Sequence, residues 1–127
     1  MSEAAKSKNI LIIDDDRGLV KMISSCLLSA GFAVWAADSG ETGLTLARQN
    51  KPDLIILDVL LPKLKGREVC AKLKADGETR DIPVIFLTAK DSPDDVVAEL
   101  EVGAVAHLTK PVNTQLLLAE VKNVLKI

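Results

Sequence analysis

The chain has 127 residues, of which 48% are hydrophobic and 27% are charged, and its net charge is −2. This length fits one domain, and the composition excludes a disordered chain and is typical of a domain that folds around its own core. The weak negative charge and the low aromatic content of 2% argue against direct binding to nucleic acid, which favours a basic face or stacking aromatic rings.

The polar segment 1–8 lacks the apolar centre of a signal peptide, and we expect it to be a flexible tail before a domain that spans 9–127. No apolar run approaches the roughly 18 residues that cross a bilayer, so we expect no membrane association and a cytoplasmic location. The cysteines, Cys26 and Cys70, are far apart in helix-like segments. We expect both to be reduced packing residues, with a disulfide bond or a catalytic thiol as the alternative.

Five short apolar runs predict β-strands. Several are apolar at successive positions, which is typical of strands that are buried on both faces of a parallel sheet. The runs cover 9–14, 33–37, 54–58, 83–88 and 104–109.

A helical pattern follows each predicted strand. The first has apolar residues spaced along one helix face, and Gly31 is placed to end it; these residues are Leu19, Met22, Ile23, Cys26, Leu27 and Ala30. The other helical segments cover 39–50, 66–77, 92–103 and 113–127, and three of them begin with the capping residues Ser39, Ser92 and Asn113. This alternation predicts an α/β fold, a doubly wound parallel sheet with helices on both faces.

Polar residues stand at the carboxyl ends of four predicted strands, where open α/β sheets bind their ligands. They are Asp14, Asp15, Asp16, Asp58, Thr88, Thr109 and Lys110. Carboxylates that share a pocket repel one another, and Mg²⁺, which prefers oxygen ligands, relieves that repulsion. Taken alone, the three successive acids could simply decorate a helix N-terminus, and Asp58 could be a cap or turn residue. Their conjunction at one edge of the sheet favours a metal-dependent site.

With these residues in this order, the chain resembles a response regulator receiver domain of two-component signal transduction over about residues 8–127. The resemblance rests on four short motifs: Asp14–Asp15 after ILII, Asp58 after LIIL with Pro62 and Gly66 following, Thr88–Ala89 after VIFL, and Lys110–Pro111. It implies a flavodoxin-like (βα)5 fold with strand order 2-1-3-4-5.

The resemblance also implies a phosphoacceptor function. Asp58 would accept a phosphoryl group from the histidine of a sensor kinase or a phosphotransfer protein. The implied ligands of Mg²⁺ are Asp14, Asp15, Asp58 and the backbone carbonyl of Leu60. Thr88 and Lys110 would contact the phosphoryl group, and the bond between Lys110 and Pro111 would be cis. Such a protein is not an ordinary enzyme, because it catalyses only its own phosphorylation and slow dephosphorylation.

In this family, phosphorylation moves the residue at the position of Thr88 and turns an aromatic residue of the fifth strand inward. This changes the partner face formed by the fourth helix, the fifth strand and the fifth helix. His107, the one histidine of the chain, holds the aromatic position, either as a smaller, titratable switch or as a half-buried packing residue. Val96 and Leu100, four residues apart, are candidates for an exposed partner or homodimer patch on this face.

Other positions depart from the family or vary within it. Lys65 replaces a residue that is often acidic, and with Lys63 and Arg67 it forms a basic patch, which is either a solvated turn or a docking contact for an acidic partner. In the family, the positions of Leu60 and Lys90 influence how fast water attacks the acyl phosphate.

Two other functions compete with this one. A phosphatase of the haloacid dehalogenase type also places an aspartyl nucleophile after an apolar strand, but it needs a second acid where this chain has Leu60. A phosphorylation-independent receiver that serves as an interaction module would lack one of the five site residues, and all five are present. A stand-alone regulator and a domain of a longer regulator both fit the sequence, and the downstream target is open.

Overall fold

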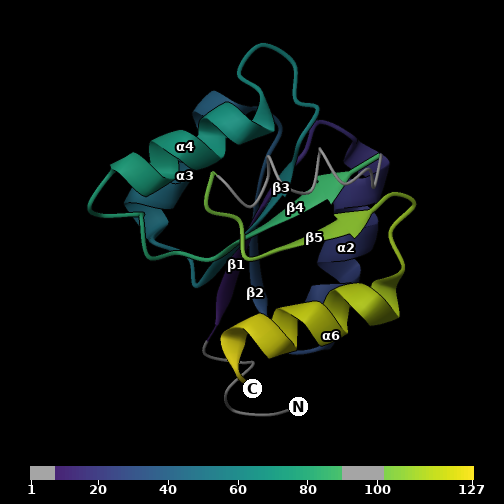
Figure 1. Ribbon diagram of the computed structural model, residues 1–127. Coiled ribbons are helices and arrows are strands. Elements are labelled where there is room, and N and C mark those ends of the chain that lie inside the picture. Colours follow the sequence, from purple (N-terminus) through teal and green to yellow (C-terminus); the bar gives the residue numbers. More distant parts are fainter. Residues whose placement is uncertain (1–7, 90–101) are drawn as a thin grey trace.

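The computed structural model describes residues 8–89 and 102–127 (Figure 1). Strands and helices alternate within these ranges. The elements are β1 (Asn9–Ile13), α2 (Arg17–Ser29), β2 (Ala33–Ala37), α3 (Gly40–Asn50), β3 (Leu54–Asp58), α4 (Gly66–Ala75), β4 (Val84–Thr88), β5 (Ala106–Thr109) and α6 (Thr114–Leu125). Most of the helix predicted at 92–103 lies outside the described residues, as do Lys90, Val96 and Leu100.

All five strands are parallel, and their order in the sheet is β2-β1-β3-β4-β5. This confirms the predicted fold class and strand order. The strands β3 and β4 are buried at every residue, whereas β2 and β5 form the edges of the sheet and are partly exposed. The continuous apolar runs of the sequence therefore mark the central strands, which have helices on both faces.

The core consists of two layers, one on each face of the sheet. Figure 1 shows α3 and α4 together on one side of the sheet and α2 and α6 on the other. Along β1 the side chains alternate between these layers: Leu11 and Ile13 pack with α3 and α4, while Ile10 and Ile12 pack with α2 and α6.

Two helix starts follow the capping residues that the sequence indicates, and a third cap was not predicted. Ser39 accepts a hydrogen bond from the backbone N–H of Thr42 at 3.2 Å, and Asn113 accepts two from the first turn of α6. Asp16 caps α2 by accepting from the N–H of Leu19 at 3.1 Å. These side chains satisfy backbone donors that have no partner inside a helix.

Some details differ from the prediction. Met22 is 40% exposed, although its spacing placed it on the buried face of α2. It lies at the margin of the apolar stripe, whose centre is formed by Ile23 and Leu27, both fully buried. Lys8, expected in the tail, already belongs to the folded part, because its carbonyl accepts a hydrogen bond from the N–H of Ala33 at 3.0 Å. The cysteines agree with the prediction, because both are free thiols.

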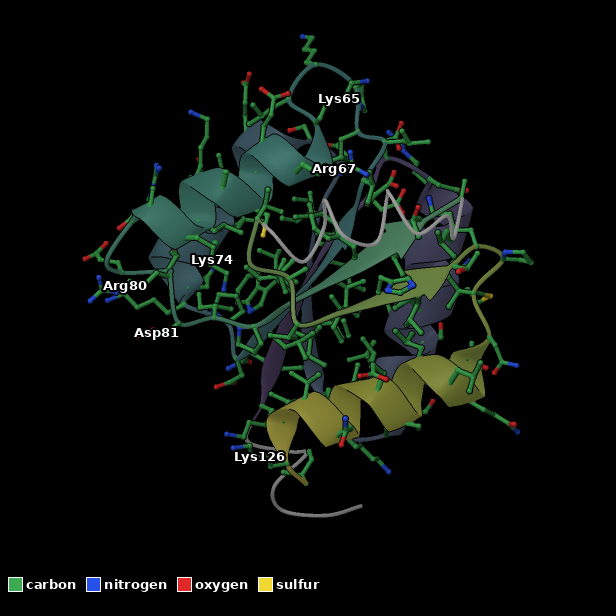
Figure 2. All side chains as sticks on the ribbon, in the orientation of Figure 1. Lys65, Arg67, Lys74, Arg80, Asp81 and Lys126 are labelled. Atoms are coloured by element: carbon green, nitrogen blue, oxygen red, sulfur yellow. The ribbon has the colours of Figure 1, made fainter. Side chains whose placement is uncertain are left out.

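Hydrogen bonds fix the connection between α4 and β4, which lies at the edge of the sheet where the strands begin. The buried hydroxyl of Thr79 donates to the carbonyl of Leu73 at 2.7 Å, and Lys74 Nζ donates to the carbonyls of Arg80 and Ile82 at 3.0 and 2.7 Å. Figure 2 shows Lys74, Arg80 and Asp81 near this end of α4, with Lys65 and Arg67 at its start. This connection fixes where β4 begins.

We therefore expect Thr79→Val to lower the free energy of unfolding by about 1–2 kcal/mol. The change removes a short, buried hydrogen bond to the carbonyl of Leu73, which keeps only the longer bond from the N–H of Asp76 at 3.4 Å. Urea denaturation measures the change. The matched control is Thr45→Val, which removes an exposed hydroxyl bonded to the carbonyl of Glu41 in α3 and should change stability by less than about 0.5 kcal/mol. Equal losses in the two variants would contradict this account.

Candidate functional site

The candidate site lies at the carboxyl edge of the sheet, where four neighbouring strands end. Asp14 follows β1, Asp58 is the last residue of β3, Thr88 is the last residue of β4, and Lys110 follows β5. Because these strands are parallel and adjacent, their final residues lie along one edge. The fold therefore gathers residues that are far apart in the sequence.

Three carboxylates cluster at this edge. Asp14, Asp15 and Asp58 each offer an oxygen, and these oxygens lie within 4.8 Å of one another. Asp14 and Asp58 are only 2% and 3% exposed, whereas Asp15 is exposed. Two buried carboxylates so close together need a positive charge nearby, because neither can be screened by water.

Lys110 supplies such a charge. Its Nζ lies 3.3 Å from Asp14 Oδ2 and 3.3 Å from Asp58 Oδ1, so one ammonium group bridges both acids. The lysine side chain is 26% exposed. Burial alone would lower the pKa of Lys110, but the charges of Asp14 and Asp58 together raise it. The lysine is therefore held in its charged form.

The surroundings of Asp14 disfavour the charged form of its carboxyl group. Its burial raises the pKa of the carboxyl group, the N–H of Asp16 opposes that rise by donating to Oδ1 at 2.9 Å, and the charge of Asp58 adds to the rise. The other oxygen, Oδ2, is buried and accepts no hydrogen bond of good geometry; its close neighbour is the Lys110 ammonium. An oxygen in this position fits a hard divalent cation, and so does a donor set made only of carboxylates.

Asp58 is oriented by its own chain. Its Oδ1 accepts a hydrogen bond from the N–H of Leu60 at 3.1 Å. The following residue, Val59, donates its N–H to the carbonyl of Leu87 in β4 at 3.0 Å. The carboxylate therefore stands on a backbone that is fixed by pairing on the β4 side, while the Leu60 side chain is 63% exposed at the rim.

The remaining candidates lie on β4 and β5. Thr88 is buried at the tip of β4, and its carbonyl accepts a hydrogen bond from the N–H of Lys110 at 2.7 Å. The peptide bond between Lys110 and Pro111 is cis. His107 is half-buried and pairs with Phe86, two residue pairs before the tips of these strands. It therefore lies beside the site and not among the acids.

One feature beside the site, a cavity, has no marker in the sequence pattern, whereas a nearby basic patch was predicted. A cavity of about 420 Å³ opens beside Asp14 between α2, β2 and α3, and its walls include Arg17, Lys21 and Asp38. The predicted basic patch consists of the exposed Lys63 and Lys65 and the half-buried Arg67. Its middle member, Lys65, is the N-cap residue before α4 and donates its backbone N–H to the Glu68 side chain at 3.2 Å.

Within residues 8–89 and 102–127, no helix has the length and apolar character that a bilayer crossing requires.

Sequence comparison relates the chain to response regulators. It is 42% identical over 120 residues to the alkaline phosphatase synthesis transcriptional regulatory protein PhoP of Bacillus subtilis, covering 94% of this chain and 49% of that protein. It is 44% identical over 117 residues to the DNA-binding dual master transcriptional regulator RpaA of Synechocystis, covering 92% of this chain and 48% of that protein. The chain thus spans about half the length of these relatives.

Solved structures give the same relation. A putative response regulator from Chloroflexus aurantiacus has a TM-score of 0.89 and 37% identity, covering 94% of this chain and 98% of that one. The receiver domain of sensor histidine kinase PA1611 from Pseudomonas aeruginosa, solved with magnesium in its active-site cleft, has a TM-score of 0.86 and 26% identity, with 94% and 98% covered. The family model for the response regulator receiver domain matches residues 10–122. The chain therefore belongs to the response regulator receiver domain family.

Proposed function

We propose that residues 9–127 form a phosphoacceptor domain that receives a phosphoryl group on Asp58 from a sensor histidine kinase or a histidine phosphotransfer protein. The observation that carries the proposal is the bridge of Lys110 Nζ to Asp14 and Asp58, 3.3 Å from an oxygen of each, beside a third acid. This arrangement offers a nucleophile, cation ligands and a fixed positive charge at one strand edge.

Asp58 is the proposed nucleophile. A carboxylate is a weak nucleophile, so the protein must contribute position and charge neutralisation. Its orientation by the N–H of Leu60 and the pairing of β3 supply the position. The proposed ligands of Mg²⁺ are Asp14, Asp15, Asp58 and the carbonyl of Leu60. When bound, the ion neutralises negative charge on the transferred phosphoryl group.

Lys110 and Thr88 are the proposed partners of that group once it is attached. The aspartyl phosphate would carry about two negative charges. The Lys110 ammonium is already held within reach of Asp58 and can pair with a phosphoryl oxygen without a large movement. Thr88 ends β4 beside the tip of β3, where its hydroxyl could donate to a second oxygen.

The proposed output is a change in the face that contains β5 and α6. Thr88 and His107 are the proposed switch residues, and the face would bind a downstream target or a second copy of the chain. Val96 and Leu100 remain candidates for this face from the sequence alone. The proposal includes a cytoplasmic location and no direct contact with nucleic acid or membrane, and the chain would act on no substrate but its own phosphoryl group.

The first test is phosphorylation itself. Incubation with Mg²⁺ and a small acyl phosphate should add the mass of one phosphoryl group to the parent chain and nothing to Asp58→Asn. Asp81→Asn, which removes an exposed acid at the opposite end of the sheet, should be modified like the parent. Intact-mass spectrometry reads the result. An unmodified parent chain would instead favour the phosphorylation-independent receiver.

The second test concerns the Lys110 ammonium group. It is proposed to stabilise the transferring phosphoryl group and to compete with Mg²⁺ for the carboxylates of Asp14 and Asp58. Lys110→Met should slow phosphorylation by about 10²-fold or more, because the charge that stabilises the transferring group is lost. The same change should leave Mg²⁺ affinity unchanged or raise it, because an ammonium group no longer competes for Asp14 and Asp58. Rate measurements and titration calorimetry check the two signs, with Lys126→Met as the exposed-lysine control. A loss of both quantities together would contradict these roles.

The third test concerns the switch. We expect His107→Ala to be phosphorylated at the parent rate, because the imidazole lies outside the acidic cluster. The chemical-shift changes that phosphorylation causes in α6 should become smaller, since the side chain that would change position on β5 is absent. Two-dimensional NMR before and after phosphorylation measures this. Shift changes of the parent size would identify His107 as a packing residue.

A further inference from the structure

Gly66, the first residue of α4, lies against the backbone of the proposed phosphoacceptor. A Cβ atom added to it would be 2.2 Å from the carbonyl oxygen of Asp58 and 2.7 Å from Cα of Val59. The N–H of Gly66 donates to the carbonyl of Val59 at 3.0 Å. The start of the helix therefore rests directly on the peptide that joins Asp58 to Val59, with no side chain between them.

This contact cannot be relieved by a change of rotamer, because the neighbouring atoms are main-chain atoms. On one side, the strand end is fixed by the hydrogen bond from Val59 to Leu87. On the other side, α4 is fixed by Val69, Cys70 and Leu73, which are buried against the sheet. Any side chain at position 66 must therefore displace either the helix start or the peptide after Asp58.

The displaced peptide would carry site atoms with it. It bears the Asp58 carboxylate directly, and one residue later comes Leu60, whose N–H orients Asp58 Oδ1 and whose carbonyl is a proposed metal ligand. We propose that Gly66 is a positioning residue of the site: its missing side chain lets α4 hold the Asp58–Val59 peptide where the Asp58 carboxylate lies beside those of Asp14 and Asp15. This inference rests on the proposed function of Asp58.

The other glycines allow matched controls. At Gly40 an added Cβ would meet Cγ2 of Val69 at 2.6 Å and the carbonyl oxygen of Leu64 at 3.1 Å. Gly40→Ala therefore also presses on α4 and on the residues before it, but its nearest contacts include no atom of Asp58 or Val59. At Gly77 an added Cβ would meet nothing within 4 Å, so Gly77→Ala reports only the change in backbone entropy.

The experiment compares Gly66→Ala with these two controls in three measurements: urea denaturation without Mg²⁺, Mg²⁺ affinity by calorimetry, and the phosphorylation rate with a small acyl phosphate at saturating Mg²⁺. We expect Gly66→Ala to lower both Mg²⁺ affinity and the phosphorylation rate by about tenfold or more, because small errors in the position of a reacting group are costly. Gly40→Ala should lose stability but keep both site quantities within about twofold of the parent, and Gly77→Ala should resemble the parent throughout.

The proposal is overturned if folded Gly66→Ala binds Mg²⁺ and is phosphorylated like the parent, or if Gly40→Ala loses as much at the site. If Gly66→Ala is partly unfolded, the titration is repeated in trimethylamine N-oxide, which favours the compact state. If the refolded variant then binds Mg²⁺ with the affinity of the parent, Gly66 has a purely structural role. A parent chain that binds Mg²⁺ but is never phosphorylated refutes the proposed function alone, because the affinity comparison still tests Gly66.

Discussion

The site depends on two carboxylates, Asp14 and Asp58, that are buried side by side at the edge of a sheet. Each would be costly alone, and together they repel, so a cation must accompany them. In this structure the Lys110 ammonium, 3.3 Å from an oxygen of each, takes that place. The two carboxylates and the ammonium group together keep a net negative charge. A divalent ion would neutralise that charge, and the buried Asp14 Oδ2 is an oxygen that fits such an ion.

The architecture makes this arrangement possible at tolerable cost. Asp14 directly follows β1 and Asp58 ends β3. Both are central strands, paired on both sides and packed between two layers of apolar side chains. A parallel sheet places the ends of sequential strands at one edge, so residues more than forty positions apart, such as Asp14 and Asp58, meet without a dedicated loop. Burial of apolar side chains in the core stabilises the fold and offsets the cost of burying charges at the edge of the sheet.

Much of this could be predicted from the sequence, because the signals are local. Continuous apolar runs marked the strands, Ser39 and Asn113 marked helix starts, and Asp58 was recognisable at the tip of a buried run. Other features depend on three-dimensional contact and leave no local pattern. The exposure of Met22 follows from which residues of α2 the sheet reaches, and the contact of Gly66 with the Asp58 backbone follows from where α4 begins. A glycine in the sequence does not show whether other atoms need the space of its missing side chain, because an added Cβ would meet backbone atoms at Gly66 and nothing within 4 Å at Gly77.

The acids and the lysine differ in how firmly the fold holds them, and this difference bears on signalling. Asp58 ends β3 and Asp14 directly follows β1, and both acids are almost fully buried beside these central strands. Lys110 instead follows β5, an edge strand whose residues are half-buried or exposed. A new charge on Asp58 would therefore be accommodated more easily by movement of β5 than by movement of the acids. His107 lies on β5, and Ala106 and Leu108 pack into the same layer as α6. If the proposed phosphorylation of Asp58 moves β5, Ala106 and Leu108 would carry that movement to the layer that contains α6, which is consistent with the proposed output face.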